Sequence, residues 1–137
     1  MNKAAAVCWT AAVLFATGGM AYGIMMAASG NHTLAPAHAH NNLIGWVTLA
    51  LYGTFYQLVP RAAEGWAARI QIALAIIGTL IIVPGIARAL RHQGETMAQT
   101  GSLVTIAAMI LFVVIVVANA WRGAHSTAPA RHHATAP

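Results

Sequence analysis

Residues 4–28 form an uninterrupted run without a single charged side chain. An α-helix needs about 20 apolar residues to cross the hydrocarbon core of a bilayer, whereas the apolar part of a secretory signal peptide has only about 7–15. This run is long enough to span a membrane. We therefore expect a retained transmembrane helix over about 4–29.

Three further apolar segments separate the few charged residues of the chain. Only 7% of its 137 residues are charged and 59% are hydrophobic, whereas about a quarter of a soluble domain is charged. The pattern predicts an all-α membrane protein whose single domain, residues 1–122, is an antiparallel bundle of four transmembrane helices. Their expected ranges are about 4–29, 36–60, 68–90 and 102–121, followed by a disordered tail over 123–137.

The basic residues set the expected orientation of this bundle. Arg88 and Arg91 fall on one side, and the other side, which holds both termini, carries five basic residues: Lys3, Arg61, Arg69, Arg122 and Arg131. The positive-inside rule places the richer side in the cytoplasm. We expect a multi-pass protein of a bacterial inner membrane, with both termini cytoplasmic and the histidine-rich loop periplasmic.

The net charge of +5 is accounted for by this topology, because the basic residues lie between apolar segments. The sequence shows no basic patch interleaved with aromatic residues, so no nucleic-acid partner is expected. The only acids, Glu64 and Glu95, fall in predicted loops. A proton pump that uses an acidic relay inside the membrane is therefore not expected from this chain alone.

Histidines gather at the outer start of the second segment, at positions 32, 38 and 40, and His92 follows the third segment. Imidazole binds zinc, copper and iron, and it also serves as an axial heme ligand. Side chains two positions apart on a helix point about 200° away from each other. A helical His38 and His40 therefore cannot face one heme plane, whereas in a turning segment they and His32 could share one metal ion.

Several other residues could bind a metal ion or pack helices together, and we interpret them as packing residues. The methionines at positions 20, 25, 26 and 97 and Cys8 are typical of helix contacts in membranes. Gly19 and Gly23 form a GxxxG pair, which permits close helix contact. Gly45 and Gly53 lie on one stripe below the histidines, where they would admit either a flat macrocycle or another helix. The tail histidines, His125, His132 and His133, are interpreted as polar tail residues.

Several residues of the second segment form a longer pattern: His40-x-Asn42, Gly45-Trp46, Gly53 and Tyr56-Gln57-Leu58-Val59-Pro60. This pattern resembles the second helix of subunit I of the heme-copper oxidases, in particular the cbb-type cytochrome oxidases and the nitric oxide reductases. In those proteins a His-Thr-Asn sequence opens the helix, and a Tyr-x-x-Val-Pro-like sequence closes it. The string from His38 to Trp46 is also similar to that of short membrane proteins assigned to the same superfamily.

The resemblance implies a heme b site. The family's histidine at this place is an axial ligand of the low-spin heme near the outer face, a role that falls on His40, and Asn42 matches the asparagine that follows. His38 is the next candidate. A second axial ligand would come from His92, His32 or another copy of the chain. The family's remaining heme and copper ligands lie on later helices, so we do not expect a complete terminal oxidase.

Two functions follow from these patterns. The first is a heme b-binding membrane protein for electron transfer or diatomic gas sensing, in a homo-oligomer or a respiratory membrane complex. The alternative is a non-catalytic subunit or assembly factor that binds copper or zinc through His32, His38 and His40. A purely structural bundle that retains an ancestral motif is a third interpretation.

Overall fold

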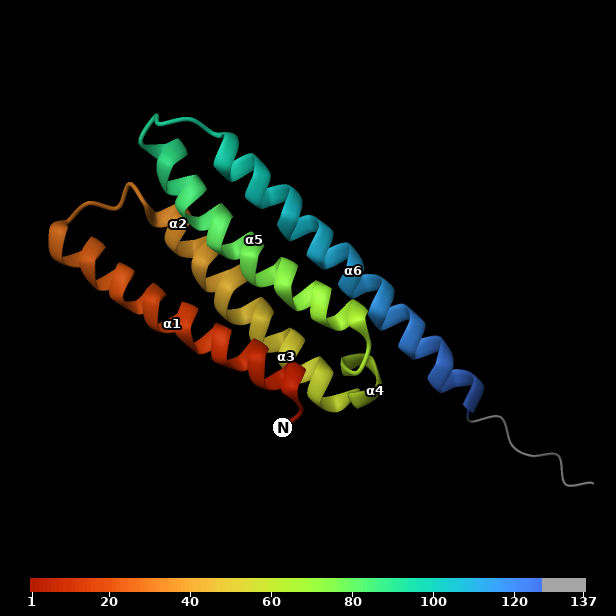
Figure 1. Ribbon diagram of the computed structural model, residues 1–137. Helices are drawn as coiled ribbons and strands as arrows, with labels where there is room; N and C mark the ends of the chain where they lie inside the picture. The colour runs from red at the N-terminus through yellow and green to blue at the C-terminus, as the bar shows by residue number, and fades with distance from the viewer. Residues whose placement is uncertain (127–137) are drawn as a thin grey trace, which may run out of the picture.

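The computed structural model describes residues 1–126, and all of its regular elements are helical. Three helices are long and apolar enough to cross a membrane: α1 (Lys3–Ser29), α5 (Trp66–Leu90) and α6 (Thr96–Ser126). They lie lengthwise beside the other helices in one elongated bundle (Figure 1). The all-helical class is thus confirmed, and the three apolar helices are consistent with a multi-pass membrane protein.

The segment predicted as the second helix consists of three consecutive elements. These are α2 (Ala35–His40), the π-helix η1 (Asn41–Thr48) and α3 (Leu49–Leu58). The backbone is right-handed helical at both junctions, with φ −63° at His40 and −65° at Thr48, so the path is continuous. A short helix, α4 (Pro60–Ala63), follows. Whether this path is a fourth membrane span stays a prediction.

Two helix boundaries differ from those expected. Helix α6 begins at Thr96 and not near residue 102. The residues before Ser102, expected in a loop, are helical. It also extends to Ser126, so it takes in the first residues of the segment predicted as a tail. Residues 127–137, with His132 and His133, lie outside the described part of the chain. Helix α5 contains Pro84 and continues past it to Leu90.

Small residues bring α5 and α6 into close contact. A Cβ atom at Gly85 would lie 2.5 Å from the backbone nitrogen of Ala98, and one at Gly101 would lie 2.6 Å from the Cα atom of Ile82. Helices in lipid gain stability from such close approach, because hydrocarbon surroundings offer no hydrophobic gain for burying apolar side chains. The glycines therefore hold the two helices together.

The core is aromatic at the end of the bundle where α3 ends. Tyr52, Phe55 and Tyr56 of α3 pack around Phe112 of α6, with ring centroids 4.4–6.2 Å apart. Cys8 is fully buried in the same cluster, which confirms its interpretation as a packing residue. This aromatic core fixes the lower half of the second helical path and leaves its histidine end to pack against α1 and α5.

Candidate functional site

The π-helix η1 begins directly after His40. The Thr48 hydroxyl donates to the carbonyl oxygen of Leu43, five residues earlier, at 2.7 Å. The wider turn leaves Asn41 buried, and its Nδ2 donates to the carbonyl oxygen of Phe15 on α1 at 2.8 Å. π-helical turns in proteins often occur at functional sites. Here the turn joins the histidine end of the helix to α1.

The GxxxG pair of α1 receives polar side chains of the second helical path. A Cβ atom at Gly19 would overlap the Asn42 amide and lie 2.8 Å from Asn41 Nδ2. A Cβ atom at Gly23 would lie 3.3 Å from His38 Cε1. The predicted close contact is therefore real, and its partner lies within the same chain.

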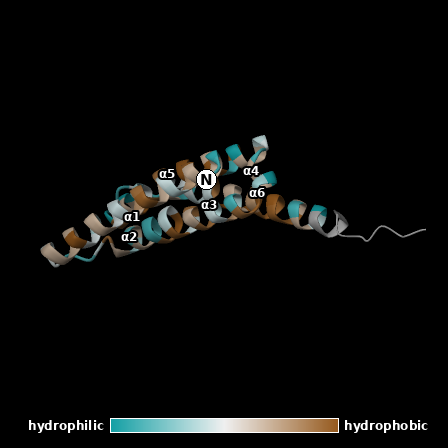
Figure 2. Ribbon diagram, turned by 90° about the horizontal axis from the view of Figure 1, so that it is seen from below, coloured by the Kyte–Doolittle hydropathy of each residue, from teal (hydrophilic) through white to brown (hydrophobic). Residues whose placement is uncertain are grey.

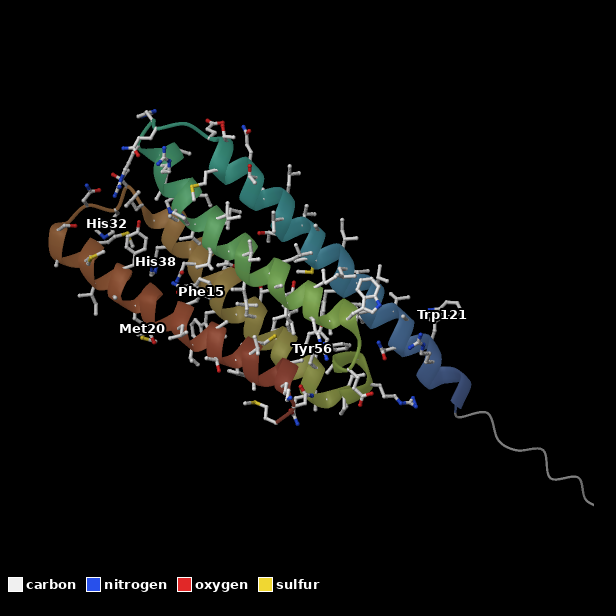
Figure 3. All side chains as sticks on the ribbon, viewed as in Figure 1. Phe15, Met20, His32, His38, Tyr56 and Trp121 are labelled. Atoms are coloured by element: carbon white, nitrogen blue, oxygen red, sulfur yellow. The ribbon has the colours of Figure 1, made fainter. Side chains whose placement is uncertain are left out.

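His38 faces α1. Its Nε2 lies 3.0 Å from Asn42 Nδ2, and its ring meets Tyr22 edge-on at a centroid distance of 6.1 Å (Figure 3). If the amide donates, Nε2 is the acceptor and the proton is on Nδ1. That Nδ1 atom is buried and has no hydrogen-bond partner among the described residues. Asn42, matched by resemblance to a heme-site asparagine, thus contacts His38 and not His40.

His40 faces the opposite side of the helix. Its Nδ1 lies 2.8 Å from the carbonyl oxygen of Pro36, so this nitrogen carries a proton and donates. The ring contributes to a cavity of about 340 Å³ between the second helical path, α5 and α6. The cavity wall is mostly apolar. Its other polar residues are Thr48, Tyr52, Ser102 and Thr105, whose hydroxyls donate to neighbouring backbone carbonyls or, for Tyr52, to the Met109 sulfur. The prediction that His38 and His40 point apart is confirmed.

The glycines of the predicted stripe, Gly45 and Gly53, lie on the α1 side. A Cβ atom at Gly45 would lie 2.7 Å from the Phe15 ring, and one at Gly53 would lie 2.9 Å from Trp9 Cδ1. The sequence left open whether this stripe admits a flat macrocycle or another helix. The structure shows that helix α1 packs against it. No macrocycle is expected against this stripe.

The remaining candidate ligands do not assemble with these two histidines. His32 is exposed in the loop after α1, and its Nδ1 lies 3.3 Å from the carbonyl oxygen of Gly30 (Figure 3). His92 is exposed after α5 and has a φ of 58°. Among residues 1–122, whose side chains the structure describes, no group of three or more His, Cys, Asp or Glu could hold a metal ion. The helix continues through positions 38 and 40, so those rings diverge instead of converging with His32.

The sequence did not reveal which residues surround His38 on the α1 side and His40 on the opposite side of the helix. The carbonyl oxygen of Pro36, which orients His40, carries no side-chain signal except its spacing of four residues from the histidine. The hydroxyl residues on α6 that line the His40 cavity are ordinary helix residues in sequence. The pair of asparagines at 41 and 42 was the one visible signal. Asn42 contacts His38 at the four-residue spacing of a helix, whereas Asn41 bonds to Phe15 on α1.

Comparisons with protein-family models, curated proteins and solved structures found no match to this chain. The resemblance to the oxidase subunit stays a prediction from the sequence pattern alone.

Proposed function

We propose that this chain is a membrane protein that binds heme b through His40 Nε2, for electron transfer or, with one axial position open, for sensing a diatomic gas. Support comes first from the contact between His40 Nδ1 and the Pro36 carbonyl oxygen. A histidine that ligates iron commonly donates its other ring N–H to a carbonyl or carboxylate, which fixes the ring and its tautomer. That requirement is met at His40 within a single helical turn.

The surroundings of His40 are the second support. Cofactor pockets are mostly apolar with a few polar groups, and volumes of about 300–1,000 Å³ are usual. The cavity beside His40 lies in that range and is lined mainly by apolar residues, with four residues that carry a hydroxyl. His40 can thus supply one axial ligand of a heme iron. Because His32 and His92 do not assemble with His40, the second ligand would come from a histidine of another copy in a homo-oligomer or respiratory complex.

The proposal includes a four-span topology. Residues 35–59 carry no Asp, Glu, Lys or Arg, so the path through α2, η1 and α3 can cross a bilayer beside the three long helices. The charge distribution then places His40 near the periplasmic surface of a bacterial inner membrane. A heme at that depth is accessible to electron carriers outside the membrane.

An absorption spectrum of the purified full-length chain tests the proposal. Heme b gives a sharp Soret band and split α and β bands on reduction. We expect His40→Ala to lose these bands, and His38→Ala, on the same turn but on the α1 side, to keep them. Equal loss in both variants would point to a fold effect and contradict the assignment. Protein from heme-replete cells that contains copper or zinc but no heme would instead favour a metal-binding subunit.

A further inference from the structure

A second cavity lies at the other end of the bundle, far along the helices from His40. Its volume is about 850 Å³, and it separates the start of α1 from α4 and the first turns of α5. Figure 1 shows these three elements at the end where the chain begins, and Figure 2 shows hydrophilic residues around α4. The cavity shares no residue with the one beside His40.

The cavity is charged at one end and apolar at the other. Lys3 and Arg69 line its charged end, together with the carboxylate of Glu64. Val7, Ile72 and Ile76 line the rest. Along α5 the wall runs from Arg69 to Ile76, which is about 10 Å of helix. The lining therefore matches an elongated molecule with a negative head and an apolar body.

We propose that this cavity binds one anionic glycerophospholipid. The phosphate lies between the Lys3 ammonium and the Arg69 guanidinium, and an acyl chain follows the aliphatic wall. Two cations and one carboxylate leave a local charge of one positive unit, which an anionic headgroup neutralises and a zwitterionic one does not. Glu64 is then placed to accept a hydrogen bond from a headgroup hydroxyl.

Other occupants fit this lining less well. A soluble anion such as free phosphate would use the two basic residues but leave the apolar part of the cavity empty. A second copy of the chain would bring Lys3 and Arg69 of both copies to one interface in a two-fold dimer, where like charges repel. A lipid of the surrounding bilayer would contact both the charged and the apolar part of the cavity, and it is present at high local concentration.

Native mass spectrometry of the full-length protein in detergent tests the proposal with phosphatidylglycerol and phosphatidylcholine as probes. We expect one phosphatidylglycerol adduct to survive at concentrations where phosphatidylcholine is lost. Each basic residue near a membrane surface changes anionic-lipid affinity about fivefold. Lys3→Gln and Arg69→Gln should each weaken the adduct by about that factor, whereas Arg91→Gln, at the opposite end of α5, should leave it unchanged.

The apolar half is tested separately by Ala73→Phe. This exposed residue lines the cavity without charge, so the larger ring fills the space for the acyl chain while both cations stay in place. We expect weaker phosphatidylglycerol binding. Unchanged binding in Ala73→Phe, equal retention of both lipids, or equal affinity of Arg69→Gln and Arg91→Gln would each overturn the proposal. Displacement of the lipid by glycerol 3-phosphate at equal concentration would assign the site to a soluble anion.

The variants leave His40 and its cavity intact, so the result is independent of heme binding. All three lipid-site substitutions are at exposed positions, and circular dichroism checks that they keep the helical content of the parent chain. A parent chain that is dimeric, shows no lipid adduct and dissociates in Ala73→Phe would assign the cavity to a second copy instead.

Discussion

The hydroxyl of Tyr56 donates a hydrogen bond to Gln71 Oε1 at 3.0 Å, and both side chains are fully buried. The bond joins the last turn of α3 to the start of α5 across the aromatic core. The Gln71 Nε2 atom is also buried and has no partner among the described residues. The pair therefore holds two helices together and leaves one amide donor unpaired.

Tyr56→Phe should destabilise the protein by about 1 kcal/mol. Interhelical hydrogen bonds in membrane proteins contribute about 0.6 kcal/mol on average and reach about 1.7, and here the loss leaves a buried amide oxygen unpaired. Unfolding in sodium dodecyl sulfate measures the change. The matched double variant Tyr56→Phe/Gln71→Leu removes both polar groups and should recover part of it. A double variant that is less stable than Tyr56→Phe would contradict this role.

The histidine end shows how far sequence reasoning extends. The divergence of His38 and His40 was predictable because it depends only on helix period. The partner of Asn41 was not, because Phe15 lies on α1, whereas the contact of Asn42 with His38 follows the four-residue spacing of a helix. The hydrophobic pattern does not predict a π-helical turn, because such a turn requires no change in which residues are apolar. The GxxxG pair predicted a close contact of α1 but not the segment that packs against it.

Gly19→Ala should destabilise the protein by about 1–3 kcal/mol, in the range of overpacking in a filled core. The new methyl group would displace the Asn41 and Asn42 side chains, whose amides are bonded to Phe15 and His38. Gly18→Ala is the control, because a Cβ atom there has nothing within 4 Å. Thermal unfolding in detergent distinguishes them. Equal stability of the two variants would show that the polar side chains do not fill the groove at Gly19.

Asn2→Ala should destabilise α1 by about 1 kcal/mol, because Asn2 is its N-cap. Its Oδ1 accepts from the Ala5 amide at 2.9 Å, and its backbone N–H donates to Gln57 Oε1 at 3.0 Å. Its Nδ2 also donates to the carbonyl oxygen of Tyr56. Asn2→Asp keeps a capping oxygen but sets a carboxylate oxygen against the Tyr56 carbonyl oxygen in place of the donor, so it should lie between the parent chain and Asn2→Ala. Amide hydrogen exchange in the first turns of α1 ranks the three proteins, and an Asp variant as labile as the Ala variant would exclude a capping contribution.

His40→Gly should allow free imidazole to restore heme binding, if the proposed heme site is correct. The substitution removes the ring while the carbonyl oxygen of Pro36 and the adjoining cavity remain. Imidazole added in solution can then donate to that carbonyl and present its other nitrogen to iron, as the side chain does. We expect the Soret band to return as imidazole is titrated into the heme-reconstituted variant.

The same titration of His38→Gly is the matched control for this rescue. His38 lies two residues away on the α1 side, where its Nε2 contacts Asn42. Heme binding in this variant should be retained without imidazole and should not respond to its addition. A His40→Gly protein that stays heme-free at saturating imidazole, while His38→Gly regains heme on titration, would transfer the axial role to His38. That outcome would place the heme between α1 and α2 and contradict the His40 assignment, because the two rings lie on opposite faces of one helix.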